Sequence, residues 1–374
     1  MKTPRCLPRI LSLAAAAALI PRPASAWSAN GHSTIAQIAQ DLLTKNAQGG
    51  DAASGAALAS IKAIMTSDPA DTGFAWSDNA LSQLAPCADS IRVEPASPGY
   101  PAVNAGDPVT CDKGLIHFTA AATSALHFVD VSVAAPATPD SVAAACASAG
   151  GACVVGAIEN NLAVLSDPAA SMADKKLALA YVVHFVGDEH QPLHCATQYV
   201  DPSRTGPNDR SDHGGNGKGV KLGGAVLNLH SLWDHQIAAT DAGNDPAVES
   251  KRLEDALPAG ATSDWTAPGF VAAAALESFD IAQNAIYKPF PSYPTTTAMD
   301  EEKKRPTTVS ILPGDYESQM RPIVDGRLQR GGVRLAALLK QALGGSSNAP
   351  AAAPVPPAVQ KAEDGVRRAE STPL

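Results

Sequence analysis

Apolar residues recur every three or four positions over residues 32–43 and again over residues 332–343. This spacing predicts two amphipathic helices. Residues 173–190 are apolar nearly all round, which predicts a helix that is buried on every side. Pro192 is expected to end that helix, and the stretch NLHSLWDHQIA begins another.

Strand-like alternation of apolar and polar residues is nearly absent. Three polar stretches rich in Gly, Pro or Thr are expected to be loops: residues 95–113, 201–224 and 288–306. Residues 27–343 are therefore predicted to form a single, mostly helical domain of the all-α class. Residues 344–374 have the composition of a disordered Pro/Ala-rich tail.

Residues 1–26 have the pattern of a secretory signal peptide. Basic residues at the start precede an apolar run over residues 10–20, and an Ala-Ser-Ala cleavage sequence ends at Ala26. Cleavage there would make Trp27 the first residue of a secreted or periplasmic protein. Since no second apolar run reaches the roughly 18 residues that cross a bilayer, no membrane partner is expected.

The charge balance limits how the protein could bind phosphates. The leader holds four of the 28 basic residues and none of the 37 acidic ones, so the mature chain has a net charge of −13. Such a protein does not bind nucleic acid through a broad basic surface. Phosphate binding would need local positive charge, for which bound metal ions are the obvious source.

Five cysteines remain after the leader. Cys146 and Cys153 bracket a short loop, and Cys87 and Cys111 could close a second one. Cys195 is left over and directly follows a histidine, so it is either a buried free thiol or a soft metal ligand.

Two His-x3-Asp pairs are the main chemical signal. His184 and Asp188 lie one turn apart on the predicted buried helix, and His230 and Asp234 repeat the spacing. Burying an unpaired carboxylate is costly, so Asp188 needs a cation nearby. His194 follows the break at the end of the buried helix and can fold back toward the same cavity. Imidazole nitrogens and carboxylate oxygens suit zinc.

The proposed cleavage site adds a further candidate ligand. A free α-amine on Trp27, beside its own carbonyl and five residues before His32, could chelate a metal. The plain alternative is that Trp27 only packs in the core.

Seven motifs together carry a family resemblance: WSANGH, ADSIR, LHFVD, CVVGAI, HFVGDEHQPLH, GGNGKGV and NLHSLWD. In this order, after a cleavage site at Trp27, the chain resembles the secreted zinc-dependent single-strand-specific nucleases of the S-one/P-one type, which include mung bean nuclease. Their distant relatives are the zinc phospholipases C. The resemblance covers most of residues 27–343 and implies a phospholipase C/nuclease-like helical fold with a three-zinc cleft.

The resemblance also implies a ligand set for three zinc ions per chain. The ligands are Asp89, His127, His184 and Asp188 for the first ion; His194, His230 and Asp234 for the second; and Trp27 (amine and carbonyl oxygen), His32 and a bridging oxygen of Asp188 for the third.

Three further roles follow from the resemblance, beside the bridging Asp188. Arg92 would stabilise negative charge that develops on the phosphate, and Phe128 would stack on an unpaired base. Asp130 would hydrogen-bond that base or orient the attacking water. The plain alternatives are a surface arginine and a core phenylalanine.

The implied activity is hydrolysis of single-stranded DNA and RNA to 5′-nucleotides, together with 3′-nucleotidase activity, by a monomer. The alternative enzyme is a zinc-dependent phospholipase C, in which the last ligand tends to be Glu where this chain has Asp234. A non-catalytic zinc-binding protein is a third hypothesis.

Some assignments stay open. Asp78 competes with Asp89, and His117 competes with His127 although it lacks an acid three residues later. Three histidines match no ligand position and are expected to be solvated or to support the ligands: His190, His213 and His235.

Overall fold

The computed structural model describes residues 27–93, 102–111, 114–199, 211–237, 245–300 and 305–345. The predicted signal peptide, and all but the first two residues of the predicted tail, lie outside the described residues.

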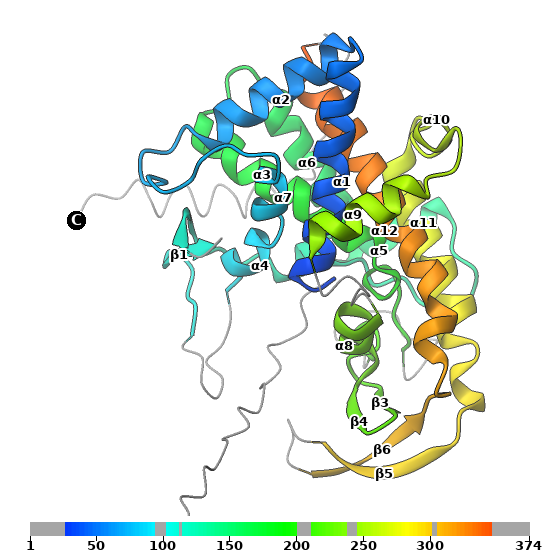
Figure 1. Ribbon diagram of the computed structural model, residues 1–374. Helices are drawn as coiled ribbons and strands as arrows, with labels where there is room; N and C mark the ends of the chain where they lie inside the picture. The colour runs from blue at the N-terminus through cyan, green and yellow to red at the C-terminus, as the bar shows by residue number, and fades with distance from the viewer. Residues whose placement is uncertain are drawn as a thin grey trace, which may run out of the picture.

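The described part of the chain is mostly helical, as predicted (Figure 1). The α-helices are α1 (Ala29–Gln48), α2 (Ala52–Met65), α3 (Ala80–Leu84), α4 (Cys87–Ile91), α5 (Pro139–Ser148), α6 (Val154–Ser166), α7 (Met172–His190), α8 (Leu229–Ser231), α9 (Pro246–Asp255), α10 (Ala261–Asp264), α11 (Phe270–Ile281) and α12 (Tyr316–Leu343). Shorter helical turns are η2 (Ser124–His127), η3 (Pro192–His194), η4 (Leu232–Ile237), η5 (Ala282–Tyr287) and η6 (Phe290–Ser292). Within these ranges, no helix combines the length and the apolar run that a bilayer-spanning segment requires.

Helix α7 is the centre of the core. The Ser171 side chain accepts a hydrogen bond from Asp174 N and caps its start, and Gln191 and Pro192 follow its last residue. All residues from 178 to 190 are buried, with α1, α2, α6, α11 and α12 packed around them. The predicted all-round burial is confirmed for residues 178–190, whereas residues 173 and 174 in the first turn are exposed.

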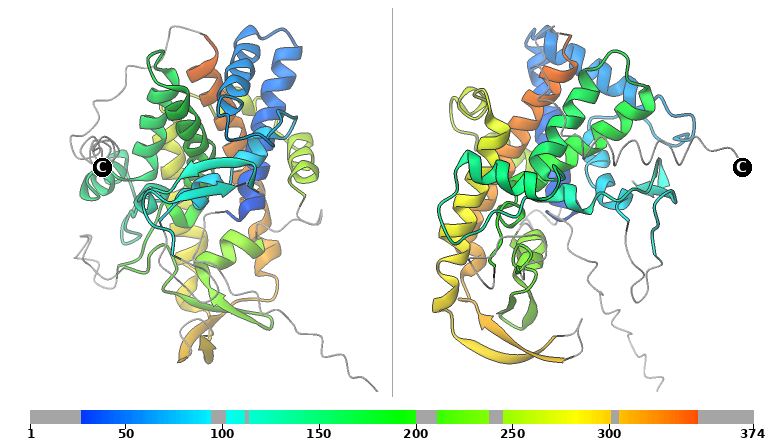
Figure 2. Two further views of the ribbon diagram at one scale, coloured as in Figure 1. Left: turned by 90° about the vertical axis from the view of Figure 1, so that its left-hand side faces the viewer. Right: turned by 180° about the vertical axis from the view of Figure 1, so that it is seen from behind.

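Helices α1 and α12 cross closely because two glycines lie at the contact. A Cβ atom at Gly331 would lie 3.1 Å from Ile35 Cδ1, and one at Gly332 would overlap the Ile38 side chain. Helix α12 runs beside α11 and then beside α1 (Figures 1 and 2). It begins 16 residues before the predicted residue 332, because its first half is largely polar and lacks a clear apolar period.

In the described part of the chain, six short strands lie within or beside the stretches that were predicted to be loops. They are β1 (Pro108–Cys111), β2 (Ile116–Thr119), β3 (Gly219–Leu222), β4 (Ala225–Asn228), β5 (Thr295–Asp300) and β6 (Arg305–Ile311).

Strands β1 and β2 form an antiparallel hairpin beside α4, which Figure 2 shows across one face of the molecule. The other four strands form a sheet in the order β4-β3-β6-β5 at one end of the helical body, where only the β3–β6 pair is parallel. The three predicted loops were wrong where these strands lie, since strands of four to seven residues show too little alternation to be recognised.

Two disulfides join neighbouring elements. Cys87–Cys111 connects α4 to β1, and Cys146–Cys153 connects α5 to the start of α6. Cys195 is a free, fully buried thiol, and its Sγ lies 3.4 Å from the Glu189 carbonyl oxygen. Burial raises the pKa of this thiol, which favours its neutral form over a metal-binding thiolate.

A buried lysine holds the α2–α3 connection and the β1–β2 hairpin against α7. Lys176 Nζ donates to Asp68 Oδ2 at 2.7 Å and to the His117 carbonyl at 3.1 Å. It also lies 2.6 Å from Asp71 Oδ2, and Asp71 Oδ1 accepts a hydrogen bond from His117 N. Since Lys176 and Asp71 are both almost fully buried, removing either one would leave the other without its partner in the interior.

We expect Lys176→Met to lower the free energy of unfolding by about 3–5 kcal/mol, because it leaves the Asp71 carboxylate buried without its cation. The matched control is Lys251→Met, which removes an exposed partner of Asp255 and should cost less than about 1 kcal/mol. Denaturant unfolding of both variants measures the difference. Equal, small changes would contradict the structural role of Lys176.

Candidate metal centre

Four elements bring one set of ligand atoms together around α7. His32 lies on the first turns of α1, Asp89 on α4 and His127 at the end of η2, while His184 and Asp188 lie one turn apart on α7. The ligand atoms of His32, His184 and Asp188 all lie within 4.8 Å of one another, and so do those of Asp89, His127 and His184.

The Asp188 carboxylate lies between these two groups. Its Oδ1 is 3.3 Å from His32 Nε2, whereas its Oδ2 is 2.9 Å from His127 Nδ1 and 3.4 Å from His184 Nε2. Asp89 Oδ1 lies 3.7 Å from His184 Nε2 and 3.8 Å from His127 Nδ1. The two Asp188 oxygens therefore face different sets of partners, which is the arrangement a bridging carboxylate needs.

A third group consists of His194, His230 and Asp234. Nδ1 of His194 lies 2.7 Å from the His127 carbonyl oxygen, and Nδ1 of His230 lies 2.7 Å from the Gly214 carbonyl oxygen. Because Nδ1 must donate its proton to a carbonyl, Nε2 of each neutral ring carries a lone pair. These two Nε2 atoms face each other at 3.1 Å, with Asp234 Oδ2 3.4 Å from His230 Nε2.

Burial sets the protonation of the cluster. It lowers the pKa of His32 and of His230 to about 4, and it also lowers the pKa of His127, His184 and His194. The rings are therefore neutral near pH 7. Burial raises the pKa of Asp188 and of Asp234 well above the usual range, so both carboxylates need a cation to remain ionised.

The unpaired atoms of the cluster test whether a metal fits. Nine buried ligand atoms have no hydrogen-bond partner among the described residues: Nδ1 and Nε2 of His32 and of His127, His184 Nε2, Asp89 Oδ1, both Asp188 oxygens and Asp234 Oδ2. Buried polar atoms are rarely left unpaired, and the converging groups take one atom from each of these residues at a time. Neutral imidazoles and carboxylates are the donor set of zinc, so the residues fit this metal.

The N-terminal segment is held close to the cluster. Trp27 is fully buried, and Ser28 N donates to the Asp234 carbonyl oxygen at 2.7 Å. Gly187 allows α1 to approach α7, because a Cβ atom there would lie 2.5 Å from His32 Nδ1. Glycine is thus the residue that leaves room for the imidazole.

Three other predicted site residues lie along the same region. Arg92 Nη1 is 3.8 Å from Asp89 Oδ1. Phe128 directly follows His127 and is 39% exposed, unlike a core phenylalanine. Asp130 lies two residues further along the chain, in a tight turn in which Val131 N donates to the Val129 carbonyl oxygen. Burial raises the pKa of Asp130 to about 6; the charge of His213 lowers it and that of Asp212 raises it.

The competing candidates lie elsewhere. Asp78 and His117 belong to none of the three groups among the described residues, and His117 Nδ1 lies 3.1 Å from Asp71 Oδ1. His213 and His235 are exposed. His190 is not solvated: it is fully buried, with Nε2 3.0 Å from Arg334 Nη1, so it belongs to the packing of α7 against α12.

Gln191 is a residue that sequence reasoning missed. It is fully buried after the end of α7, and its Nε2 donates to Asp234 Oδ1 at 2.6 Å. Its Oε1 accepts a hydrogen bond from Leu193 N at 2.6 Å. The amide therefore orients the Asp234 carboxylate and shapes the turn that leads to His194. The only sequence feature that could have indicated this role is the position of Gln191 within HFVGDEHQPLH.

A mostly helical domain with three converging His/Asp groups is the architecture of a multi-metal protein. Residues 27–344 match the family described as S1/P1 Nuclease, and the chain belongs to this family.

The curated relatives carry nuclease names. The chain is 31% identical to Endonuclease 4 of Arabidopsis thaliana over 194 residues, which are 50% of this chain and 60% of that protein. It is 32% identical to Endonuclease 2 of the same plant over 201 residues, 52% of this chain and 63% of that protein. Similarity to Nuclease S1 of Aspergillus oryzae is lower, at 24%, but extends over 345 residues, 89% of this chain and 97% of that protein. The chain thus aligns with less than two thirds of these two plant proteins and with nearly all of the fungal one.

We expect Gln191→Leu to weaken binding of one metal ion about 10–100-fold, because the partner that orients Asp234 is lost. Titration with a zinc chelator measures the affinity of each ion. Gln37→Leu is the matched control, since Gln37 is also buried but donates to Asp41 Oδ1 and the Asp78 carbonyl. Identical chelator titrations for both variants would show that Gln191 has no positioning role.

Proposed function

We propose that the protein is a zinc-dependent phosphodiesterase that hydrolyses single-stranded DNA and RNA to 5′-nucleotides and also removes the phosphate of 3′-nucleotides. The observation that carries the proposal is the convergence of three buried His/Asp groups beside an exposed phenylalanine, Phe128. Membership of the S1/P1 nuclease family supports this activity over that of a phospholipase C.

The residues that would hold three zinc ions per chain form three sets. They are Asp89, His127, His184 and Asp188; His194, His230 and Asp234; and Trp27, His32 and Asp188. Bound zinc would polarise phosphoryl oxygens and make water a better nucleophile near neutral pH. The unpaired Asp188 and His atoms support this assignment.

Protein side chains would supply the remaining functions. The guanidinium of Arg92, close to Asp89, would hold a phosphate oxygen and stabilise its growing charge. Phe128 would stack on a base, which favours unpaired strands because a paired and stacked base does not offer its face. Asp130, two residues further along the chain, would hydrogen-bond that base or orient water.

The proposal includes export. Removal of residues 1–26 would free the Trp27 amine, and the family match that begins at residue 27 supports a mature chain starting there. The two disulfides are consistent with an oxidising compartment outside the cytoplasm. We propose that the secreted or periplasmic protein acts as a monomer on single-stranded nucleic acids and 3′-nucleotides.

The first experiment tests the Trp27 ligand. Protein made in the cytoplasm with Met before Trp27 should bind fewer zinc ions and be nearly inactive, because an amide nitrogen is a very poor zinc donor. Exported protein cut after Ala26 should bind three zinc ions and be active. Mass spectrometry of the N-terminus, a metal count and one nuclease assay make the comparison.

The control for this experiment carries a tag after residue 374, which should change neither zinc content nor activity. Equal zinc content and activity with the blocked N-terminus would refute the Trp27 assignment.

The second experiment tests base stacking. Phe128→Ala should lose about 1–3 kcal/mol of binding per stacked base and cleave single-stranded oligonucleotides correspondingly less well. Hydrolysis of an abasic phosphodiester should change little. Phe270→Ala, on α11, which carries none of the proposed ligands, serves as control for general destabilisation. An equal loss on both substrates would mean that Phe128 supports the fold rather than the base.

A further inference from the structure

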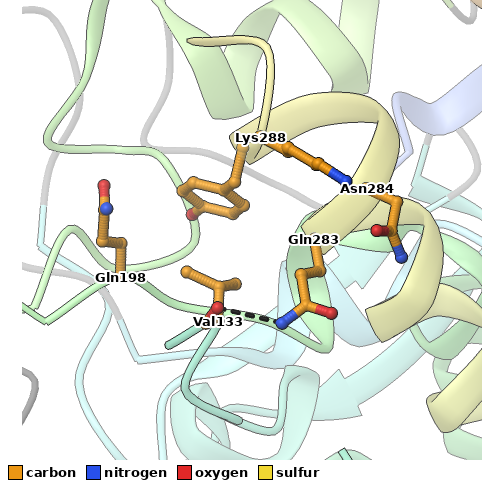
Figure 3. Close-up of a pocket in the computed structure, with 6 residues that line it drawn as sticks. Val133, Gln198, Gln283, Asn284 and Lys288 are labelled. Atoms are coloured by element: carbon orange, nitrogen blue, oxygen red, sulfur yellow. Dashed lines mark hydrogen bonds between the residues drawn. The ribbon is translucent and has the colours of Figure 1, made fainter. Parts of the chain in front are cut away.

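A pocket outside the metal centre has no role in the function proposed above. It has a volume of about 390 Å³ and is lined by Val133, Gln198, Gln283, Asn284, Tyr287 and Lys288 (Figure 3). Two of these residues follow metal-centre residues closely: Val133 lies six positions after His127, and Gln198 lies four positions after His194.

Two extended segments run side by side from the metal centre to this pocket. Val129 N donates to the His194 carbonyl oxygen, Thr197 N donates to the Val131 carbonyl oxygen, and Val133 N donates to the Thr197 carbonyl oxygen. The bridge that they form at Thr197 is parallel, so both chains leave their histidines in the same direction. At about 3.3 Å per residue, the path from His127 to Val133 is at most roughly 20 Å long.

The walls of the pocket are held in place by hydrogen bonds. Gln283 Nε2 donates to the carbonyl oxygens of Val133 and Ala135, at 3.0 and 2.9 Å, and Figure 3 shows Gln198 and Gln283 on either side of Val133. The Tyr287 hydroxyl donates to Asp212 Oδ1, which also accepts a hydrogen bond from Gln198 N. The pocket is thus formed before any ligand binds.

Several groups at the pocket are available to a ligand. The side chains of Gln198 and Lys288 are exposed, and neither has a partner among the described residues. Lys218 Nζ lies 5.7 Å from the centre of the Tyr287 ring and 3.8 Å from Asp212 Oδ2, so the nearby carboxylate is partly compensated. In a mature chain with a net charge of −13, the exposed Lys288 at the pocket, with Lys218 beside Tyr287, provides local positive charge for a phosphate.

We propose that this pocket is a second subsite for single-stranded nucleic acid. It takes a nucleotide a few positions along the strand from the phosphate at the metal centre. Lys288 contacts a backbone phosphate, while the Gln198 amide and the Oε1 atom of Gln283 contact the edge of a base. The proposal rests on the proposed nuclease function and adds a substrate class: oligonucleotides long enough to reach the pocket are preferred over mononucleotides.

Salt dependence and chain length test the proposal. Binding of a phosphorothioate single-stranded oligonucleotide to zinc-loaded Lys288→Gln should show a log Kd–log [salt] slope reduced by about 0.7, as expected for one lost phosphate contact. Its kcat/KM on a single-stranded oligonucleotide should fall several-fold, with an unchanged value on a 3′-mononucleotide. Gln198→Ala should lose oligonucleotide affinity without a change in salt slope.

Lys62→Gln, an exposed lysine on α2, is the matched control and should behave as wild type. An unchanged slope for Lys288→Gln, or an equal loss on the mononucleotide, overturns the subsite. A wild-type protein that binds the oligonucleotide with a slope sensitive to Lys288 but cleaves neither substrate contradicts the proposed function and supports the subsite.

Discussion

The Asp188 carboxylate is buried in the middle of the central helix, and it has no hydrogen-bond partner among the described residues. A lone buried carboxylate is so costly that it either takes up a proton or is paired with positive charge. Here the surrounding imidazoles are themselves held neutral by burial, so they supply lone pairs rather than charge. The cluster therefore has many unpaired nitrogen and oxygen lone pairs and no positive charge of its own, an arrangement that bound cations would stabilise.

The rest of the domain keeps this unfavourable arrangement in place. The Cys87–Cys111 disulfide and the buried Lys176 attach α4 and the β1–β2 hairpin to α7, which keeps Asp89 near His184. At the other end of the helix, Gln191 connects the end of α7 to the Asp234 carboxylate across 43 positions of the chain. The cluster is therefore held by the tertiary structure and does not depend on local sequence alone.

Sequence periodicity was sufficient for the features that repeat locally. Helix α7 is apolar nearly all round, and the His184–Asp188 and His230–Asp234 pairs have helical spacing, so both the buried helix and the proximity of the paired side chains could be predicted.

The features that escaped prediction depend on distant partners or on very short patterns. His190 is buried because Arg334 reaches it from α12, 144 positions away. The strands of four residues are defined by their neighbours in the sheet, and the Thr-rich β5 was hidden within a Pro/Thr-rich stretch. The preference for Asp89 over Asp78, by contrast, came from the sequence, through the position of Arg92 in ADSIR, and among the described residues Asp89, not Asp78, lies with His127 and His184.

Gly187 shows how far the demands of such a centre extend beyond its chemistry. It bears no side-chain ligand atom, yet a Cβ atom at this position would collide with the His32 ring. A survey of all substitutions should therefore find that Gly187 tolerates none well, although it has neither an ionisable group nor a metal-binding atom. The same holds for Gly214, whose positive φ of 62° presents its carbonyl oxygen to His230. The number of positions that do not tolerate substitution is therefore larger than the number of residues that offer a ligand atom.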